Sequence, residues 1–336
     1  MSRSLLAVLA VLVLAGCAPL RQQVGTPGAA FQGPRLEQDA FVSFDGTRLG
    51  LQRWAAAGEP WAVVIGLHGM NDYANAFHLA AEHWAGEGIT TYAYDQRGFG
   101  RSPGRGVWGG REAMEDDLRA LVALVRSRHP KAVIAVAGVS MGGAVAIDAF
   151  ASDRPPAADR LVLLSPAVWG WSMQPLPNRI SLWFMAHTLR GYVVTPPGFL
   201  VRKIRATDNL PELRRMSRDP LLIWGARPDA IYGLMNLMQR GWQGTRSLPP
   251  ATLYLYGERD QIIPKKAAFE AAGRLRPPQR TAYYAAGCHL LLVDLQAARV
   301  WEDVAAFLRD PAGPLPSRAP PIPPPSAAPA GEERCL

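Results

Sequence analysis

Residues 132–150 read AVIAVAGVSMGGAVAIDAF, and this stretch decides the fold. Its first part, up to residue 137, is strongly apolar and predicts a buried strand. The small residues that begin at Met141 predict a closely packed helix. Residues 138–142 lie between the two and form a G-x-S-x-G sequence, whose glycines allow a tight turn that exposes Ser140. A strand, a sharp turn and a helix in this order predict a nucleophilic serine at the carboxyl edge of an α/β sheet.

Strand-like and helix-like segments alternate on both sides of this turn. Strands are predicted at residues 41–44, 49–54, 62–67, 90–94, 132–137, 161–164, 251–256 and 280–284. Helices are predicted at residues 76–85, 114–125, 141–150, 265–275 and 297–308. This alternation is typical of a mostly parallel sheet with helices on both faces, and the Asp45-Gly46 turn predicts an antiparallel hairpin at its start. We therefore expect an α/β fold with an eight-stranded sheet, whose core is formed by residues 37–165 and 249–310.

Residues 166–248 interrupt the alternation and are predicted to form a cap or lid. They hold nine aromatic residues, and eleven Arg or Lys residues against four Asp or Glu residues, so most of the net charge of +8 lies here. An insertion at the carboxyl end of a strand lies over the ligand crevice of an open sheet. A helical elaboration with ordinary packing aromatics is a compatible alternative. The charge suggests contact with anionic lipid through Arg202, Lys203 and Arg205.

A serine hydroxyl needs a base at neutral pH, and the base needs a carboxylate that fixes its tautomer. Among six histidines, His289 is the best candidate, because it follows the last predicted strand and returns to the carboxyl edge of the sheet. Asp260 lies just past a strand and completes the chain order Ser, Asp, His. Glu258 and Asp294 are rival carboxylates, and we expect both to have structural roles.

Two backbone N–H groups are required to stabilise an oxyanion. The residue after the nucleophile, Met141, is expected to supply one of them. The loop after the early strand at residues 62–67 is expected to supply the other from Met70, with Gly69 allowing the close approach of the backbone. His68 is then interpreted as a residue that holds this loop.

Composition excludes several classes of protein. The chain has 336 residues, of which 49% are hydrophobic and 19% are charged, a balance typical of globular proteins. No apolar run reaches the roughly 18–20 residues of a spanning helix, which excludes a polytopic membrane protein. Three cysteines exclude a disulfide scaffold and a four-Cys zinc site. No nucleic-acid-binding motif accompanies the positive charge, so no nucleic-acid partner is expected.

The N-terminus reads MSRSLLAVLAVLVLAGC and resembles the signal peptide and lipobox of bacterial lipoproteins. The resemblance implies removal of residues 1–16 and acylation of Cys17, which anchors the protein in a membrane. An ordinary secretory signal is the alternative. Residues 17–36 are expected to be a tether. Ala18 in place of aspartate favours the periplasmic side of the outer membrane, if the source is Gram-negative.

Residues 311–336 contain nine prolines and are expected to form a disordered tail. Cys335 and Cys288 are the two cysteines of the body and tail. We do not expect a disulfide between them, because Cys288 directly precedes the candidate base.

Five sequence blocks together resemble the α/β-hydrolase family. They are LHGMNDYANAF, DQRGFGRS, GVSMGG, LYGERD and GCH, and the resemblance extends over residues 37–310. The most similar group is that of the monoacylglycerol lipases and lysophospholipases, sometimes named for serine aminopeptidases. The resemblance implies an α/β-hydrolase fold, a triad of Ser140, Asp260 and His289, and oxyanion N–H groups at Met70 and Met141. Residues 71–73 read Asn-Asp-Tyr where many monoacylglycerol lipases have Gly-Glu-His. The resemblance therefore does not assign the substrate of those lipases to this chain.

These features predict a membrane-anchored serine hydrolase that acts on carboxylic esters of the acylglycerol or lysophospholipid type. Its substrate is a lipid or small ester, and neither a metal nor an organic cofactor is expected. An acyltransferase that uses the same triad is one alternative. A non-catalytic envelope lipoprotein that binds lipid or a partner is another, because fold alone does not give function.

Overall fold

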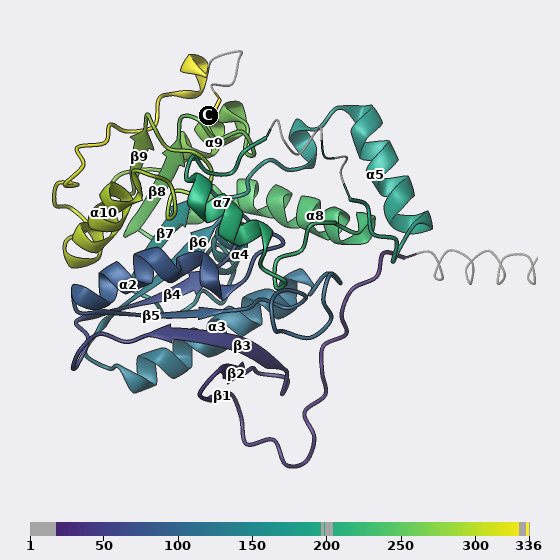
Figure 1. Ribbon diagram of the computed structural model, residues 1–336, viewed down its shortest axis with the longest axis horizontal. Coiled ribbons are helices and arrows are strands. Elements are labelled where there is room, and N and C mark those ends of the chain that lie inside the picture. Colours follow the sequence, from purple (N-terminus) through teal and green to yellow (C-terminus); the bar gives the residue numbers. More distant parts are fainter. Residues whose placement is uncertain (1–17, 196–197, 199–203, 329–333, 336) are drawn as a thin grey trace, which may run out of the picture.

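The structure is a computed structural model that describes residues 18–195, 198, 204–328 and 334–335 (Figure 1). Its sheet has the strand order β1-β2-β3-β5-β4-β6-β7-β8-β9. The strands are β1 (Arg35–Leu36), β2 (Ala40–Val42), β3 (Arg48–Trp54), β4 (Ala62–Leu67), β5 (Ile89–Tyr94), β6 (Val133–Val139), β7 (Arg160–Leu164), β8 (Thr252–Gly257) and β9 (Arg280–Tyr284). The strands from β5 to β9 in this order pair in parallel, and β1, β2 and β3 add an antiparallel edge. The mostly parallel α/β sheet is therefore confirmed.

Within the described residues the sheet has nine strands instead of the predicted eight. The additional strand is β1, whose Arg35 pairs with Val42 of β2. A two-residue strand has no hydrophobic period, so composition alone gives no signal for it. The sheet thus begins inside the segment that was expected to be a tether.

Helices cover both faces of the sheet. The helices are η1 (Ala74–Phe77), α2 (His78–Gly86), α3 (Arg111–Arg128), α4 (Met141–Phe150), η2 (Trp171–Met173), α5 (Leu176–Thr188), α7 (Leu210–Ser217), α8 (Pro228–Gly244), η3 (Thr245–Ser247), α9 (Lys265–Ala272), α10 (Ala297–Arg309) and η4 (Pro325–Ala327). Successive residues of a strand point to opposite faces, and β6 shows this. Ile134 and Val136 belong to the core cluster that includes residues of α3, α4 and α9, whereas Ala135 and Ala137 belong to the cluster that includes residues of α2 and α10. Burial on both faces explains why β6 is almost wholly apolar.

The insertion between β7 and β8 divides into two parts. Helix α8 packs directly on α4, where a Cβ added to Gly241 would lie 3.3 Å from the Cβ of Ala144. Helix α8 is therefore a layer of the body. The cap proper is limited to the segment before it, at about residues 166–227, with α5 and α7 (Figure 1). The predicted insertion at residues 166–248 therefore lies between β7 and β8, and its division into two parts was not predicted, because a helix that packs on a small-residue helix cannot be distinguished by its sequence from a helix of a lid.

The proline-rich segment at residues 311–328 packs against the body and is not disordered. Leu315 and Ile322 are buried, and the N–H of Tyr283 in β9 donates to the carbonyl of Pro320 over 2.8 Å. Proline lacks an N–H but keeps its carbonyl, so such a segment suits the outer side of an edge strand. Cys335 forms a disulfide with Cys288, which corrects the expectation that the two cysteines stay apart.

Residues 1–16, which were predicted to be a signal peptide, and Cys17 lie outside the described residues. In the part of the chain that is described, no helix combines the length and the apolar character needed to cross a membrane.

Candidate active site

Ser140 lies at the turn between β6 and α4 in a conformation that side chains rarely adopt. Its φ is 51° and its ψ is −115°. The turn is held by neighbouring chain, because a Cβ on Gly142 would lie 2.2 Å from the carbonyl oxygen of Leu67, and one on Gly138 would lie 2.6 Å from that of Gly142. Only glycine fits at these two positions. A strained conformation of this kind costs about 1–3 kcal/mol and persists because the surrounding packing imposes it.

His289 and Asp260 form a buried hydrogen-bonded pair. Nδ1 of His289 donates to Oδ2 of Asp260 over 2.8 Å. The other carboxylate oxygen accepts the N–H groups of Ile262 at 2.8 Å and Ile263 at 3.0 Å. Because Nδ1 carries the proton in this arrangement, Nε2 of the neutral ring keeps a lone pair that can accept a proton.

Ser140 and His289 share the wall of one cavity of about 220 Å³. The loop after β4 also lines it through Gly69 and Met70, and a Cβ on Gly69 would lie 3.3 Å from the Cβ of Ser140. The cavity thus lies between the serine, the imidazole and this loop. Three of the predicted site residues, Met70, Ser140 and His289, thus line the same cavity.

Two amide groups at the cavity are available as donors. Met141 is the first residue of α4, and the first N–H groups of a helix have no acceptor within it. The N–H of Met70 has no acceptor among the described residues. Two free N–H groups that flank a serine are the arrangement that stabilises an oxyanion.

His68 holds the loop and is not placed as a base. Its Nε2 accepts the backbone N–H of Gln96 over 2.8 Å, while Nδ1 donates to the carbonyl of Gly69 over 2.7 Å. Complete burial lowers the pKa of His68 to about 4, so the ring is neutral at pH 7. Next to Gln96, the side chain of Arg97 forms buried ion pairs with Asp45 and Asp117, which fixes the second loop.

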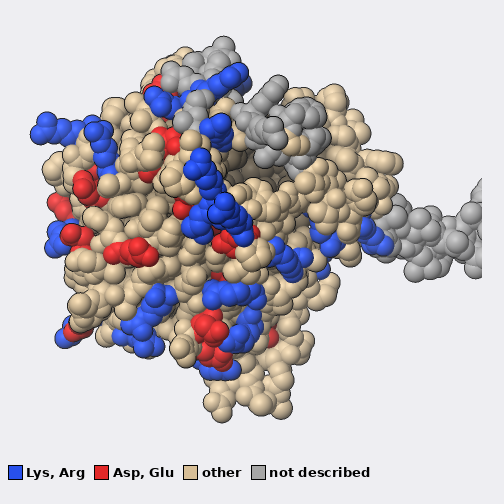
Figure 2. All heavy atoms as spheres, viewed as in Figure 1, with Lys and Arg blue, Asp and Glu red and all other residues tan. Residues whose placement is uncertain are grey.

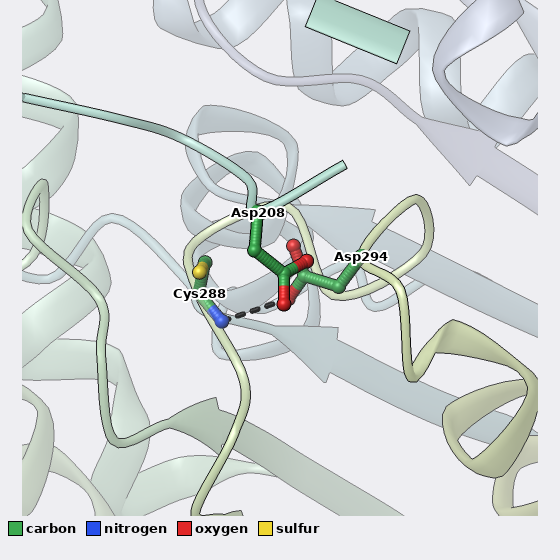
Figure 3. Close-up of side chains that lie close together, drawn as sticks. All are labelled: Asp208, Cys288 and Asp294. Carbon is green, nitrogen blue, oxygen red and sulfur yellow. Dashed lines mark hydrogen bonds between the residues drawn. The ribbon is translucent and has the colours of Figure 1, made fainter. Parts of the chain in front are cut away.

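The rival carboxylates make other contacts. Asp294 accepts the N–H of Cys288 over 2.7 Å, and burial raises the pKa of its carboxyl group to about 7. Figure 3 shows it beside Asp208 and Cys288. This cluster is not a candidate metal centre, because the sulfur of Cys288 belongs to the disulfide. Among the described residues, neither Glu258 nor Asp294 forms a hydrogen bond to His289.

The cap is joined to the loop that carries Met70 by contacts that the sequence did not reveal. The N–H of Ile223 donates to the carbonyl of Asn71 over 3.0 Å, and the hydroxyl of Tyr73 donates to Asp219 over 2.6 Å. Asp72 lies between them on the cavity wall, and desolvation raises the pKa of its carboxyl group to about 7. The only sequence signal was that residues 71–73 depart from the pattern of the monoacylglycerol lipases. The partners in these contacts are about 150 positions apart in the chain, and a local sequence pattern does not show which distant residues meet.

Comparison with known proteins extends these observations. The family model described as serine aminopeptidase, S33, matches residues 58–296. A monoacylglycerol lipase of Mycolicibacterium smegmatis is 30% identical over 234 residues, which are 68% of this chain and 80% of the relative. A monoglyceride lipase of Mus musculus is 25% identical over 265 residues, which are 77% of this chain and 85% of the relative.

Solved structures show the same fold. A soluble variant of monoglyceride lipase from Saccharomyces cerevisiae, in complex with a substrate analogue, has a TM-score of 0.68 at 19% identity and covers 88% of this chain and 99% of its own. A monoacylglycerol lipase of Paleococcus ferrophilus has a TM-score of 0.64 at 19% identity and covers 77% and 98%, respectively. The fold is therefore the expected α/β-hydrolase fold. The chain belongs to the serine aminopeptidase S33 family and is a carboxylic ester hydrolase of the serine hydrolase type.

Proposed function

We propose that this chain hydrolyses monoacylglycerols and related single-chain lipid esters, including lysophospholipids, with Ser140, His289 and Asp260 as its triad. The observation that carries the proposal is that Ser140 lines one cavity together with an imidazole already oriented by a buried carboxylate. The two relatives described above, which bear the names of monoacylglycerol and monoglyceride lipases, support this substrate class.

The reaction follows from the positions of these groups. Nε2 of His289 takes the proton of Ser140 as its Oγ attacks the ester carbonyl, and the imidazolium that forms is stabilised by Asp260. The N–H groups of Met70 and Met141 stabilise the oxyanion. The imidazolium then gives its proton to the leaving alcohol. Water, deprotonated by the same imidazole, releases the fatty acid from the acyl-enzyme.

The rest of the cavity wall favours an acyl chain. Its lining is largely apolar and comes from the cap and from the loop after β8, through Met216, Leu222, Ile223, Trp224 and Ile262. Binding sites of this kind, with few polar groups at one end, suit a substrate with a long apolar part and one reactive ester.

We also propose that the mature chain is a lipoprotein anchored through acylated Cys17 at the periplasmic side of an outer membrane. The lipobox supports this proposal, and so does the disulfide between Cys288 and Cys335, because disulfides form and persist in oxidising compartments. Arg202 and Lys203 lie outside the described residues, so the expected contact of these side chains with anionic lipid stays a prediction.

A panel of p-nitrophenyl esters, a monoacylglycerol and a lysophospholipid tests the catalytic proposal. Ser140→Ala should lower kcat by at least about 10³-fold on every substrate that the wild type hydrolyses. An added acceptor alcohol shows whether the acyl group goes to water or to another molecule. A wild-type protein that hydrolyses none of these esters and does not react with a fluorophosphonate would refute the proposed triad.

A further inference from the structure

Exposed large apolar side chains are concentrated in the cap. Eleven of the fourteen found among the described residues lie there, and two of the other three, Leu20 and Val24, lie near the N-terminus. Helix α5 shows the pattern most clearly, since its exposed apolar residues recur at helical spacing on one side. The exposed apolar residues of α5 and the segment after it are Leu176, Ile180, Trp183, Phe184, Leu189, Tyr192, Val193 and Val194. We name this surface the apolar face.

The apolar face is continuous with the rim of the active-site cavity. Trp224 lines the cavity and is also 53% exposed. A β-bridge joins Val194 to Ala226, and a Cβ added to Gly225 would lie 2.6 Å from Cγ1 of Val193. An apolar molecule that lies on this face is therefore next to the cavity that holds Ser140. In Figure 2 the surface at the upper right, where Figure 1 draws α5, is mostly uncharged, whereas charged side chains gather near α7 and over the body.

The segment that follows Cys17 is held against the molecule and does not behave as a free tether. The N–H of Gln22 donates to the carbonyl of Trp108 over 2.8 Å, and its side-chain amide donates to that of Val107 over 3.0 Å. The N–H of Gly25 donates to Asp45, the same carboxylate that binds Arg97. We name residues 18–25 the N-terminal strap.

The strap reaches the cap at its first residue. Arg190, which follows α5, donates to the carbonyl of Ala18 over 3.4 Å. Residues 18–21 also line a groove of about 410 Å³ together with Trp108 and with Tyr232 of α8. In Figure 1 the described chain begins beneath α5 and runs down one side of the body. Ala18, the first residue that the structure describes, therefore lies beside the cap.

We propose that the strap holds acylated Cys17 beside the apolar face, so that the anchor and this face contact the same bilayer and the cavity opens toward it. The inference rests on the proposed acylation of Cys17. A flexible tether over residues 18–36 would have an end-to-end distance of about 25 Å and would allow the body to turn freely. Because the strap is bound to the body and to the cap, the body does not turn freely relative to the anchor. Exposed Arg179 and Arg190 beside the apolar side chains suit the headgroup region, where arginine side chains reach polar groups while their stems stay in apolar surroundings.

A fluorescence experiment on the full acylated chain in phosphatidylcholine–phosphatidylglycerol vesicles tests the contact. Phe184→Cys is labelled with an environment-sensitive fluorophore, and a quencher is attached to the acyl chains of the lipid. The matched control is Arg154→Cys, which lies between α4 and β7 at the opposite, amino-terminal edge of the sheet. We expect quenching at position 184 to be several-fold stronger than at position 154. Equal quenching at the two positions would overturn the proposal.

The role of the strap is tested by an insertion of about twenty Gly and Ser residues between Ala18 and Pro19, a length that frees the anchor from the cap. We expect quenching at position 184 to fall several-fold, together with hydrolysis of a monoacylglycerol embedded in the same vesicles. Hydrolysis of a water-soluble p-nitrophenyl ester should not change. Unchanged quenching after the insertion would show that the strap does not orient the protein.

The apolar face itself is tested by Phe184→Ser, with Leu295→Ser as a matched exposed apolar residue outside it. We expect the first variant alone to lose activity on vesicles while keeping activity on the soluble ester. Cross-links between copies through position 184, without quenching by lipid, would assign the face to a second copy and overturn the proposal. An N-terminal peptide that carries no acyl chain would refute the anchor, whereas loss of soluble-ester hydrolysis in Ser140→Ala tests the catalytic proposal separately.

Discussion

Helices α4 and α5 differ sharply in burial: α4 follows Ser140 in the body, and α5 lies in the cap. Every residue of α4 is buried, whereas Ala186 is the one buried residue of α5. The packing of α4 imposes the conformation of Ser140 and leaves little room for change. Helix α5 is held mainly by its contact with α8 and directs apolar side chains outward. We therefore propose that the body fixes the positions of the reacting atoms, while the cap controls what reaches them.

The largest expected effect tests whether chemistry belongs to the body alone. Asp260→Asn should lower kcat by about 10⁴-fold, because an amide favours the wrong tautomer of His289. The loss should be equal on a soluble ester and on a monoacylglycerol in vesicles, as measured by initial rates. Glu258→Gln is the matched control and should keep kcat within a few-fold of the wild type. A loss of activity on the lipid substrate alone would contradict the proposal that the chemistry depends on the body and not on the cap.

The next effect concerns the link between the C-terminal segment and the loop of His289. Cys335→Ser opens a disulfide whose cysteines are 47 residues apart, and the free energy of unfolding should fall by about 4 kcal/mol. Urea unfolding without reductant measures it. Wild-type protein unfolded in the presence of reductant should match the variant. Equal stability of the variant and the oxidised wild type would contradict the prediction.

A third prediction tests the rigidity of the turn. Gly142→Ala should lower the free energy of unfolding by about 3 kcal/mol, because the new Cβ would lie 2.2 Å from the carbonyl oxygen of Leu67. Gly86→Ala is the control, since no atom lies within 4 Å of a Cβ added there. The control should be neutral or stabilise by up to about 1 kcal/mol. Similar thermal unfolding of the two variants would show that the turn adapts more easily than its packing suggests.

The smallest effect tests the seam between body and cap, where Asp294 lies near Thr207 and Asp208. Burial raises its pKa from 3.8 to about 7, so between these values the folded carboxyl group holds a proton that the unfolded one has lost. Its contribution to stability is complete below pH 3.8 and is lost as the pH rises through 7. Between these pH values the free energy of unfolding therefore declines by up to about 1.4 kcal/mol per pH unit.

Asp294→Asn should remove that contribution, which urea unfolding at pH 5 and pH 7 measures as a change in the difference between the two stabilities. Asp153→Asn, in an exposed loop, should leave the difference as in the wild type. If the curves of Asp294→Asn and the wild type run parallel between these pH values, the carboxyl group of Asp294 does not hold its proton as proposed.

Sequence patterns predicted the parts of the fold in which local composition and burial agree. Strand β6 and helix α4 are apolar and small because both are enclosed, so their sequence carries the information directly. The structure places His289 and Asp260 side by side, as the chain order Ser, Asp, His suggested.

The missed features depend on partners that are distant in the chain. Helix α8 belongs to the body because it meets Ala144, and Tyr73 binds the cap through Asp219. The C-terminal segment has the composition of a disordered chain, yet its two large apolar residues within 311–325, Leu315 and Ile322, are both buried. The average composition of a segment does not show that a few apolar side chains are enough to hold it against the body.

The packing of the proline-rich C-terminal segment on β9 affects how the protein behaves at high protein concentration. Strand β9 ends the sheet, and an unpaired strand edge is a template on which other chains can add strands and aggregate. The carbonyl of Pro320 already occupies an N–H of this edge. Prolines have no N–H with which to continue a ladder, so the covering segment does not offer a new edge in turn. The opposite edge is the two-residue β1, which is too short to recruit a partner. Both ends of the sheet are thus protected against association with unfolded chains at high local concentration.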